Sequence, residues 1–97
     1  MIIVIQRRAE IALRSLPKTD QKQISRAIDD ITQLDQKDLG LNPKFHRLQV
    51  ASGAKKLIYR GNQRLRLVLS IEGEVCNVED IVDHDRLDQL LKNWEQL

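Results

Sequence analysis

The sequence has one cysteine, few aromatic residues and no long apolar run. Cys76 has no second thiol with which to form an internal disulfide. No stretch approaches the roughly 18 consecutive apolar residues that a membrane-spanning helix needs. The apolar start MIIVI is too short for a signal peptide, and its charges follow the run instead of preceding it. We therefore expect a cytoplasmic protein that does not enter a membrane.

Several motifs of catalytic and ligand-binding proteins are also missing. There is no cysteine–histidine spacing for zinc, no glycine-rich phosphate loop and no serine triad. Asp83 and Asp85 are interpreted as helix caps and not as a cation site, so we expect no metal and no cofactor. The only aromatic residues, Phe45, Tyr59 and Trp94, are too few for base stacking to dominate affinity. This argues against a general binder of single-stranded nucleic acid.

The net charge is only +2, but the charges are unevenly distributed. The segment 44–66 holds seven cations and no acid: Lys44, Arg47, Lys55, Lys56, Arg60, Arg64 and Arg66. From residue 67 onward, eight acids stand against two cations, Arg86 and Lys92. Either the basic surface meets an anionic partner, or it pairs with the chain's own acidic neighbour.

Hydrophobic periodicity predicts a strand at 1–5 followed by two helices. An apolar stripe over 9–16 indicates a helix that Pro17 stops. A second stripe over 24–34 indicates another helix, with Thr19 or Asp20 as its cap. In the simplest arrangement the two helices form an antiparallel hairpin.

After a polar loop, the second half of the chain reads as a strand meander and a final helix. Strands are expected at 45–50, 55–60, 64–71 and 75–82. The last helix has its apolar stripe at Leu87, Leu90, Leu91 and Trp94, with Asp83 or Asp85 as its cap. The prediction is one α+β domain over residues 1–97, with the helices on one face of a mainly antiparallel sheet.

The clearest alternation runs from Arg64 to Ile71, with the two arginines opposite an apolar row. A three-residue loop, 61–63, would pair Arg60 with Arg64 and turn Leu57 inward. A two-residue loop would instead put Lys55, Leu57 and Tyr59 on the arginine side. We favour the first, which buries Leu57 and gathers four cations on one face: Lys56, Arg60, Arg64 and Arg66.

Four neighbouring cations repel one another unless an anion is present, and RNA or DNA phosphate is the obvious anion. The arginine guanidinium suits it because its planar fork can donate two hydrogen bonds to a phosphate. The alternatives are an ordinary solvated sheet face and a dock for an acidic protein segment.

The order of elements and the charged hairpin resemble the RelE/ParE superfamily, the bacterial toxins of type II toxin–antitoxin systems. The resemblance covers nearly the whole chain. LPKTDQKQISRAIDDITQL resembles the family's second helix after a Leu-Pro. HRLQ resembles the family's leucine before a loop, and KKLIYRGNQRLRLVLSIEG resembles its Lys/Tyr-rich strand, turn and Arg-hydrophobic strand. VEDIVDHDRLDQLL falls where the family has its last strand and C-terminal segment.

The resemblance implies a metal-independent mRNA endonuclease that acts on ribosome-bound message and is held by an antitoxin. In the ribosome-dependent members, sheet cations bind mRNA and stabilise charge at the scissile phosphate, which the RNA's own 2′-hydroxyl attacks. Arg66 matches the family's strand arginine, Lys56 or Lys55 matches its strand lysine, and Arg60 has a looser counterpart. The implied RNA-binding residues are Arg47, Lys55, Lys56, Arg60, Arg64 and Arg66. The implied catalytic residues are Lys56, Arg66, His84 and Arg86.

The segment VDHDRL departs from the family pattern. Asp83 replaces the family's glycine, Asp85 stands at its usual arginine with Arg86 one place later, and its tyrosine falls near Leu91. His84 has two interpretations. It is a proton-transfer residue, since histidine is suited to proton transfer near neutrality, or it is only the residue at the start of the last helix. Two alternatives therefore stay open: a ParE-type inhibitor of DNA gyrase without nuclease activity, and an inactive relative that still binds an antitoxin.

Overall fold

The computed structural model describes residues 1–38, 42–49 and 55–95. No helix in these ranges has both the length and the apolar character needed to cross a membrane. The α+β class and the order of elements are as the sequence predicts. In chain order they are β1 (Ile2–Ile5), α1 (Arg7–Arg14), α2 (Lys18–Thr32), a 3-10 turn (Gln36–Asp38), β2 (Phe45–Gln49), β3 (Lys55–Arg60), β4 (Leu65–Glu72), β5 (Val75–Asp83) and α3 (His84–Glu95).

The strands form one sheet in the order β1-β5-β4-β3-β2. β2, β3, β4 and β5 pair antiparallel as a meander, and β1 joins the free side of β5 in parallel. Gly73 permits the β4–β5 turn because its φ of 59° lies in the left-handed region that favours glycine. The mainly antiparallel sheet expected from the sequence is confirmed.

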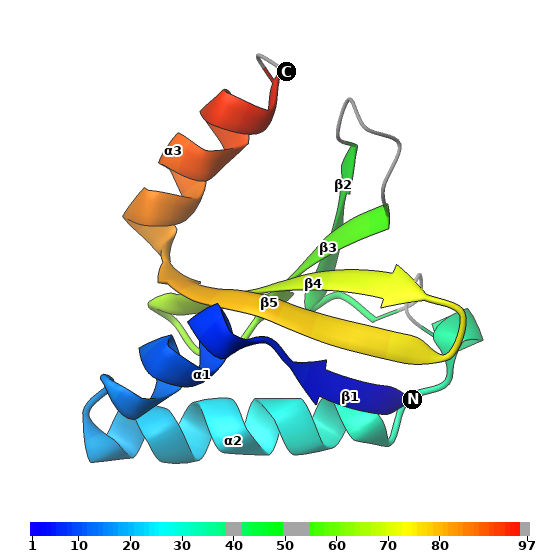
Figure 1. Cartoon of the computed structure of the whole chain (residues 1–97), viewed down its shortest axis with the longest axis horizontal. Coiled ribbons are helices and arrows are strands. Elements are labelled where there is room, and N and C mark those ends of the chain that lie inside the picture. The colour runs from blue at the N-terminus through cyan, green and yellow to red at the C-terminus, as the bar shows by residue number, and fades with distance from the viewer. Residues whose placement is uncertain (39–41, 50–54, 96–97) are drawn as a thin grey trace.

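The main core lies between the sheet and the helices α1 and α2 (Figure 1). Each helix turns its apolar stripe inward, and the strands contribute every second side chain. Ile24 and Ile31 of α2 are fully buried against this face, together with Leu67 and Leu69 of β4 and Val78 of β5. The β3–β4 turn contacts the first turns of α2, where the Asn62 side chain donates to Asp20 and Gln23.

The helix α3 lies on the opposite face of the sheet (Figure 1). Its Leu87 packs in a small cluster with Ile58, Val68 and Val82. The expectation that all helices share one face is therefore wrong for α3. The reason is that β3, β4 and β5 each carry an apolar side chain on the second face, and Leu87 covers them. The side chains of Leu90, Leu91 and Trp94 lie outside the described residues.

The helix starts differ from one another in how they are capped. α2 begins at Lys18 after Pro17, so neither Thr19 nor Asp20 is its cap. Proline suits such a boundary because it has no backbone N–H to satisfy. α3 has the predicted cap, since the Arg86 backbone N–H donates to Asp83 Oδ1 over 2.7 Å.

Candidate functional site

The β3–β4 register decides which cations share a face. Arg60 pairs with Arg66, Ile58 with Val68 and Lys56 with Ser70. Residues directly opposite each other in an antiparallel pair lie on the same face. Lys56, Arg60 and Arg66 therefore share one face, as predicted, but Arg64 does not. The predicted pairing of Arg60 with Arg64 is wrong.

Asn62 explains why the loop is longer than predicted. Its Oδ1 accepts hydrogen bonds from the backbone N–H groups of Arg64 (2.9 Å) and Leu65 (2.7 Å). The Gly61 N–H donates to the Leu65 carbonyl oxygen over 3.1 Å. This side-chain-to-backbone turn takes Arg64 out of the strand. The register differs from the predicted one by two residues, which is an even number. All the remaining side chains of the two strands therefore keep the face that was predicted for them.

Two of the four predicted face cations pair with the chain's own acids. Arg64 Nη2 lies 2.6 Å from Asp20 Oδ2 on α2. Lys56 Nζ lies 2.6 Å from Glu79 Oε2, where the β4–β5 register shifts. For these two residues, the interpretation that the basic surface pairs with its own acidic neighbour is correct.

Arg60 and Arg66 are different. Their Cα atoms are about 5 Å apart, as in any directly opposed pair, and no described carboxylate forms an ion pair with either. The pKa of Arg66 lies below its ordinary value, first because of burial and second because of the nearby charge of Arg60. Two adjacent guanidinium groups without an acid form a place that favours an anion.

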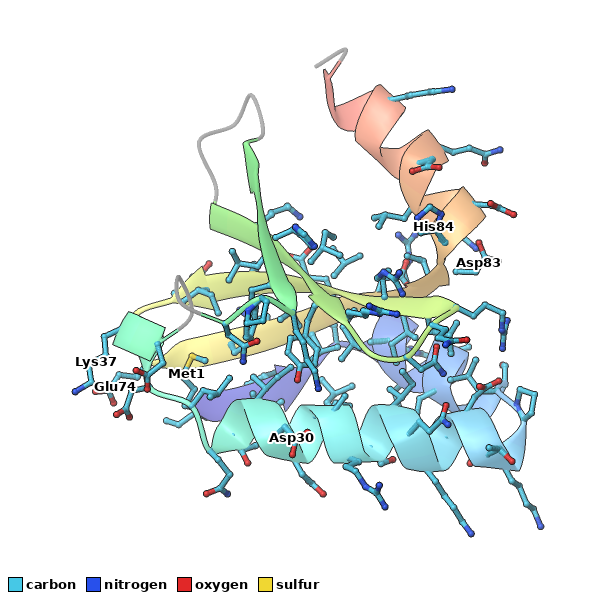
Figure 2. All side chains as sticks on the ribbon, turned by 180° about the vertical axis from the view of Figure 1, so that it is seen from behind. Met1, Asp30, Lys37, Glu74, Asp83 and His84 are labelled. Atoms are coloured by element: carbon cyan, nitrogen blue, oxygen red, sulfur yellow. The ribbon has the colours of Figure 1, made fainter. Side chains whose placement is uncertain are left out.

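The start of α3 lies beside this pair. Val82 of β5 pairs with Arg66, Asp83 pairs with Leu65, and the His84 backbone N–H donates to the Arg64 carbonyl oxygen over 3.0 Å. Figure 2 shows Asp83 and His84 at the end of α3 nearest the sheet, far from Asp30 on α2. The positive end of the α3 dipole adds to the field of the arginines.

The structure brings Arg60, Arg66 and His84 to one end of the sheet, with Arg86 exposed in the first turn of α3. Lys56 is four residues from Arg60 along β3, or about 13 Å in an extended strand. The Ile58–Val68 pair lies between them. The backbones of Arg47 and Lys55 pair with Leu57 and Gln49, but both side chains lie outside the described residues.

The sequence did not indicate an open groove of about 700 Å³ on the other side of the turn. Its walls are α2 and the β3–β4 turn, which lie about forty residues apart in the chain, so no local pattern could reveal it. The lining residues are Asp20, Gln23, Arg26, Ala27, Asp30, Lys44 and residues 60–64. Sequence reasoning also missed Asn62, whose only signal was the turn-forming Gly-Asn dipeptide.

No family model and no curated protein matches the chain. Among solved structures, the chain is similar to the archaeal RelE–RelB complex from Pyrococcus horikoshii OT3. The TM-score is 0.68 at 16% sequence identity, over 88% of this chain and 96% of that chain. At this identity the likeness concerns the fold. The chain has a RelE-like fold.

Proposed function

We propose that this chain is the toxin of a type II toxin–antitoxin pair and that it cleaves ribosome-bound mRNA in the cytoplasm. The observation that carries the proposal is the Arg60–Arg66 pair, which has no described acidic partner and sits in a RelE-like fold. An RNA phosphate would bind between the two guanidinium groups and relieve their repulsion.

The proposed reaction needs no metal. The 2′-oxygen of the RNA attacks the adjacent phosphorus, and the bond from phosphorus to the 5′-oxygen breaks. A 2′,3′-cyclic phosphate forms, one proton leaves the 2′-hydroxyl, and one proton joins the departing 5′-oxygen. Arg66 and Arg60 would stabilise the charge that develops on the phosphate oxygens. His84 would carry one of the two protons, since its backbone is hydrogen-bonded to the turn that leads into Arg66.

The other basic residues take secondary roles in this proposal. Lys56 contacts RNA outside the cleavage centre, because Glu79 holds its ammonium group and about 13 Å of strand separate it from Arg60. Arg47 and Lys55 would bind message along the same strands, and Arg86 would meet it at the start of α3. Arg64 contributes less, because Asp20 already neutralises it.

The proposed partner is an antitoxin. The structural neighbour is a RelE–RelB complex, and this chain has an apolar surface suited to a protein. Ile2 and Val4 are 59% and 42% exposed on β1, which lies at the end of the described sheet. Exposed apolar side chains on an edge strand are typical of a site that another chain covers.

A second candidate function follows from the acidic start of α3. Asp83, Asp85 and Asp88 lie on the same end of the helix as His84, and Asp88 Oδ2 is 3.9 Å from His84 Nδ1. These negatively charged carboxylates would repel a phosphate. They favour a ParE-type inhibitor of DNA gyrase, or an inactive relative that only binds its antitoxin.

Induced expression separates these functions. The chain is expressed alone and with the product of each adjacent reading frame, while growth is followed and RNA 5′ ends in polysomes are mapped. The proposal predicts growth arrest, new 5′ ends within translated message, and relief by one neighbour that copurifies with the chain. Growth arrest with broken DNA and intact message would indicate the gyrase inhibitor. No arrest and no copurifying neighbour would contradict both functions.

A further inference from the structure

Asn62 uses its whole side-chain amide to fasten the β3–β4 turn. Its Oδ1 accepts from the backbone N–H groups of Arg64 and Leu65. Its Nδ2 donates to Asp20 Oδ1 (3.1 Å) and Gln23 Oε1 (2.9 Å) on α2. An asparagine side chain has two donor hydrogens and one acceptor oxygen with two lone pairs, so these four bonds use its full capacity. The turn is thus fixed both internally and against a helix.

This fixed turn also holds the side chain of Arg66. Arg66 Nη1 donates to the carbonyl oxygens of Asn62 (2.7 Å), Leu65 (3.0 Å) and Gln63 (3.3 Å). Among the described residues nothing accepts from its Nη2 or Nε. Nη2 and Nε form the edge with which arginine makes two parallel hydrogen bonds to one phosphate.

Helix α2 is the base of this arrangement. Asp20 accepts from Asn62 with one carboxylate oxygen and pairs with Arg64 through the other, at 2.6 Å. Gly61 lets the turn approach the helix closely, because a Cβ there would collide with the Ile24 side chain and lie 2.8 Å from Leu67 Cδ1. The location of the turn carbonyls is therefore set by α2 and not by the hairpin alone.

We infer that Asn62 is a positioning residue: it holds the turn carbonyls that fix Arg66, so that the Nη2–Nε edge is ready for a phosphate. The identity of that phosphate as mRNA rests on the proposed function. The physical gain is pre-organisation, since a long arginine side chain held before binding loses little freedom when the anion arrives.

The first test is the guanidinium NMR signal of Arg66, assigned with the variant Arg66→Lys. In the wild type, bonded Nη1 should slow rotation of the guanidinium group and keep its Nη signals distinct. Asn62→Ala should average them toward the values of a free arginine. The matched control is Gln63→Ala, because Gln63 is exposed in the same turn and contributes only its backbone carbonyl. Unchanged Arg66 signals in Asn62→Ala would overturn the inference.

The second test is the kinetics of mRNA cleavage on programmed ribosomes. Asn62→Ala should lower kcat about 10-fold to 100-fold with KM changed by less than about threefold, because misplacement acts on the transition state. Altered Arg66 signals with unchanged kcat would overturn a role in the reaction.

The two tests separate the two claims. If the folded wild type cleaves nothing, the proposed function fails, and the NMR comparison alone decides whether Asn62 positions Arg66. If Asn62→Ala does not fold, Asn62→Ser replaces it, because serine keeps one acceptor oxygen but cannot reach α2 with two donors. In both measurements we expect Asn62→Ser to change the result in the same direction as Asn62→Ala.

Discussion

Arg60 and Arg66 lie directly opposite each other on β3 and β4, and no described carboxylate lies in ion-pair contact with them. Like charges in this position destabilise a sheet. The pKa of Arg66 is lowered first by burial and second by the charge of Arg60. An anion between the two groups converts this repulsion into attraction. The pair is therefore the strongest indication of where the proposed phosphate would bind.

The variant Arg60→Ala separates binding from folding. It should weaken RNA binding and reduce the slope of log affinity against log salt by about one, as expected for one lost phosphate contact. The free energy of unfolding should stay within about 0.5 kcal/mol, because Arg60 is exposed and its loss removes a repulsion. Filter binding over a salt series measures the slope. Arg14→Ala on α1, also an exposed arginine, is the control and should leave the slope unchanged.

The Gly61 position tests the contact between the turn and α2. Gly61→Ala should lower the free energy of unfolding by about 1–3 kcal/mol, because the new methyl group overpacks the site. Ile24→Val removes the Cδ1 atom that the new methyl group would meet. The double variant should therefore regain part of the free energy of unfolding that Gly61→Ala loses. Urea unfolding of the four proteins measures the coupling.

Gly73→Ala is the matched control for that cycle. A Cβ at Gly73 meets no atom within 4 Å, but its φ of 59° is unfavourable for alanine, at a cost of about 1 kcal/mol. It should show no coupling to Ile24→Val. Additive effects of Gly61→Ala and Ile24→Val would contradict the packing described for the turn.

The elements were predictable because most of the signals are local. Ile24, Ala27 and Ile31 repeat at helical spacing, and Leu65, Leu67 and Leu69 alternate, so periodicity alone indicates helix and strand. The face occupied by α3 was not predictable. It depends on Leu87 meeting Ile58, Val68 and Val82, which come together only once three strands have paired.

The candidate site, like the fold, was predictable only in part. The alternation from Arg64 to Ile71 identified the face that carries Arg66, because a shift of two residues in register leaves each side chain on the same face of the sheet. It placed Arg64 wrongly, because the Asn62 side chain bonds to the turn backbone and lengthens the loop. The partners of Lys56 and Arg64 were hidden as well, since Glu79 and Asp20 lie far away in sequence.

Cys76 gives the fold a specific response to alkaline pH. Burial raises the pKa of its thiol to about 11, whereas an unfolded chain releases that proton near pH ~8.5–9. The unfolded state then binds fewer protons between these values, so the free energy of unfolding falls as the pH rises. From about pH 8 to about pH 10, the wild type should lose roughly 1.5 kcal/mol more than Cys76→Ala. Equal losses in urea unfolding would contradict the burial of this thiol.

His84 is tested by the pH dependence of cleavage. If His84 carries a proton in the reaction, it should produce a limb in the plot of log kcat against pH. His84→Ala should lower kcat by about 10²–10⁴ and flatten this limb. His46→Ala, at an exposed position on β2, should keep the wild-type profile. A preserved limb in His84→Ala would assign the proton transfer to another group.

The most direct measurement is cleavage of mRNA on programmed ribosomes by the wild type, Arg66→Ala and Arg66→Lys. Arg66→Ala removes a charge-assisted contact that strengthens as the phosphate gains charge, so the rate should fall about 10²–10³-fold, or about 3–4 kcal/mol. Arg66→Lys should recover only part, because a point charge does not reproduce the bidentate fork. The lost turn contacts should cost about 1 kcal/mol of stability, which a melting curve monitors. A folded Arg66→Ala protein that cleaves message at the wild-type rate would contradict the placement of Arg66 at the cleavage centre. A folded wild type that cleaves no message would contradict the ribonuclease account and favour the gyrase inhibitor.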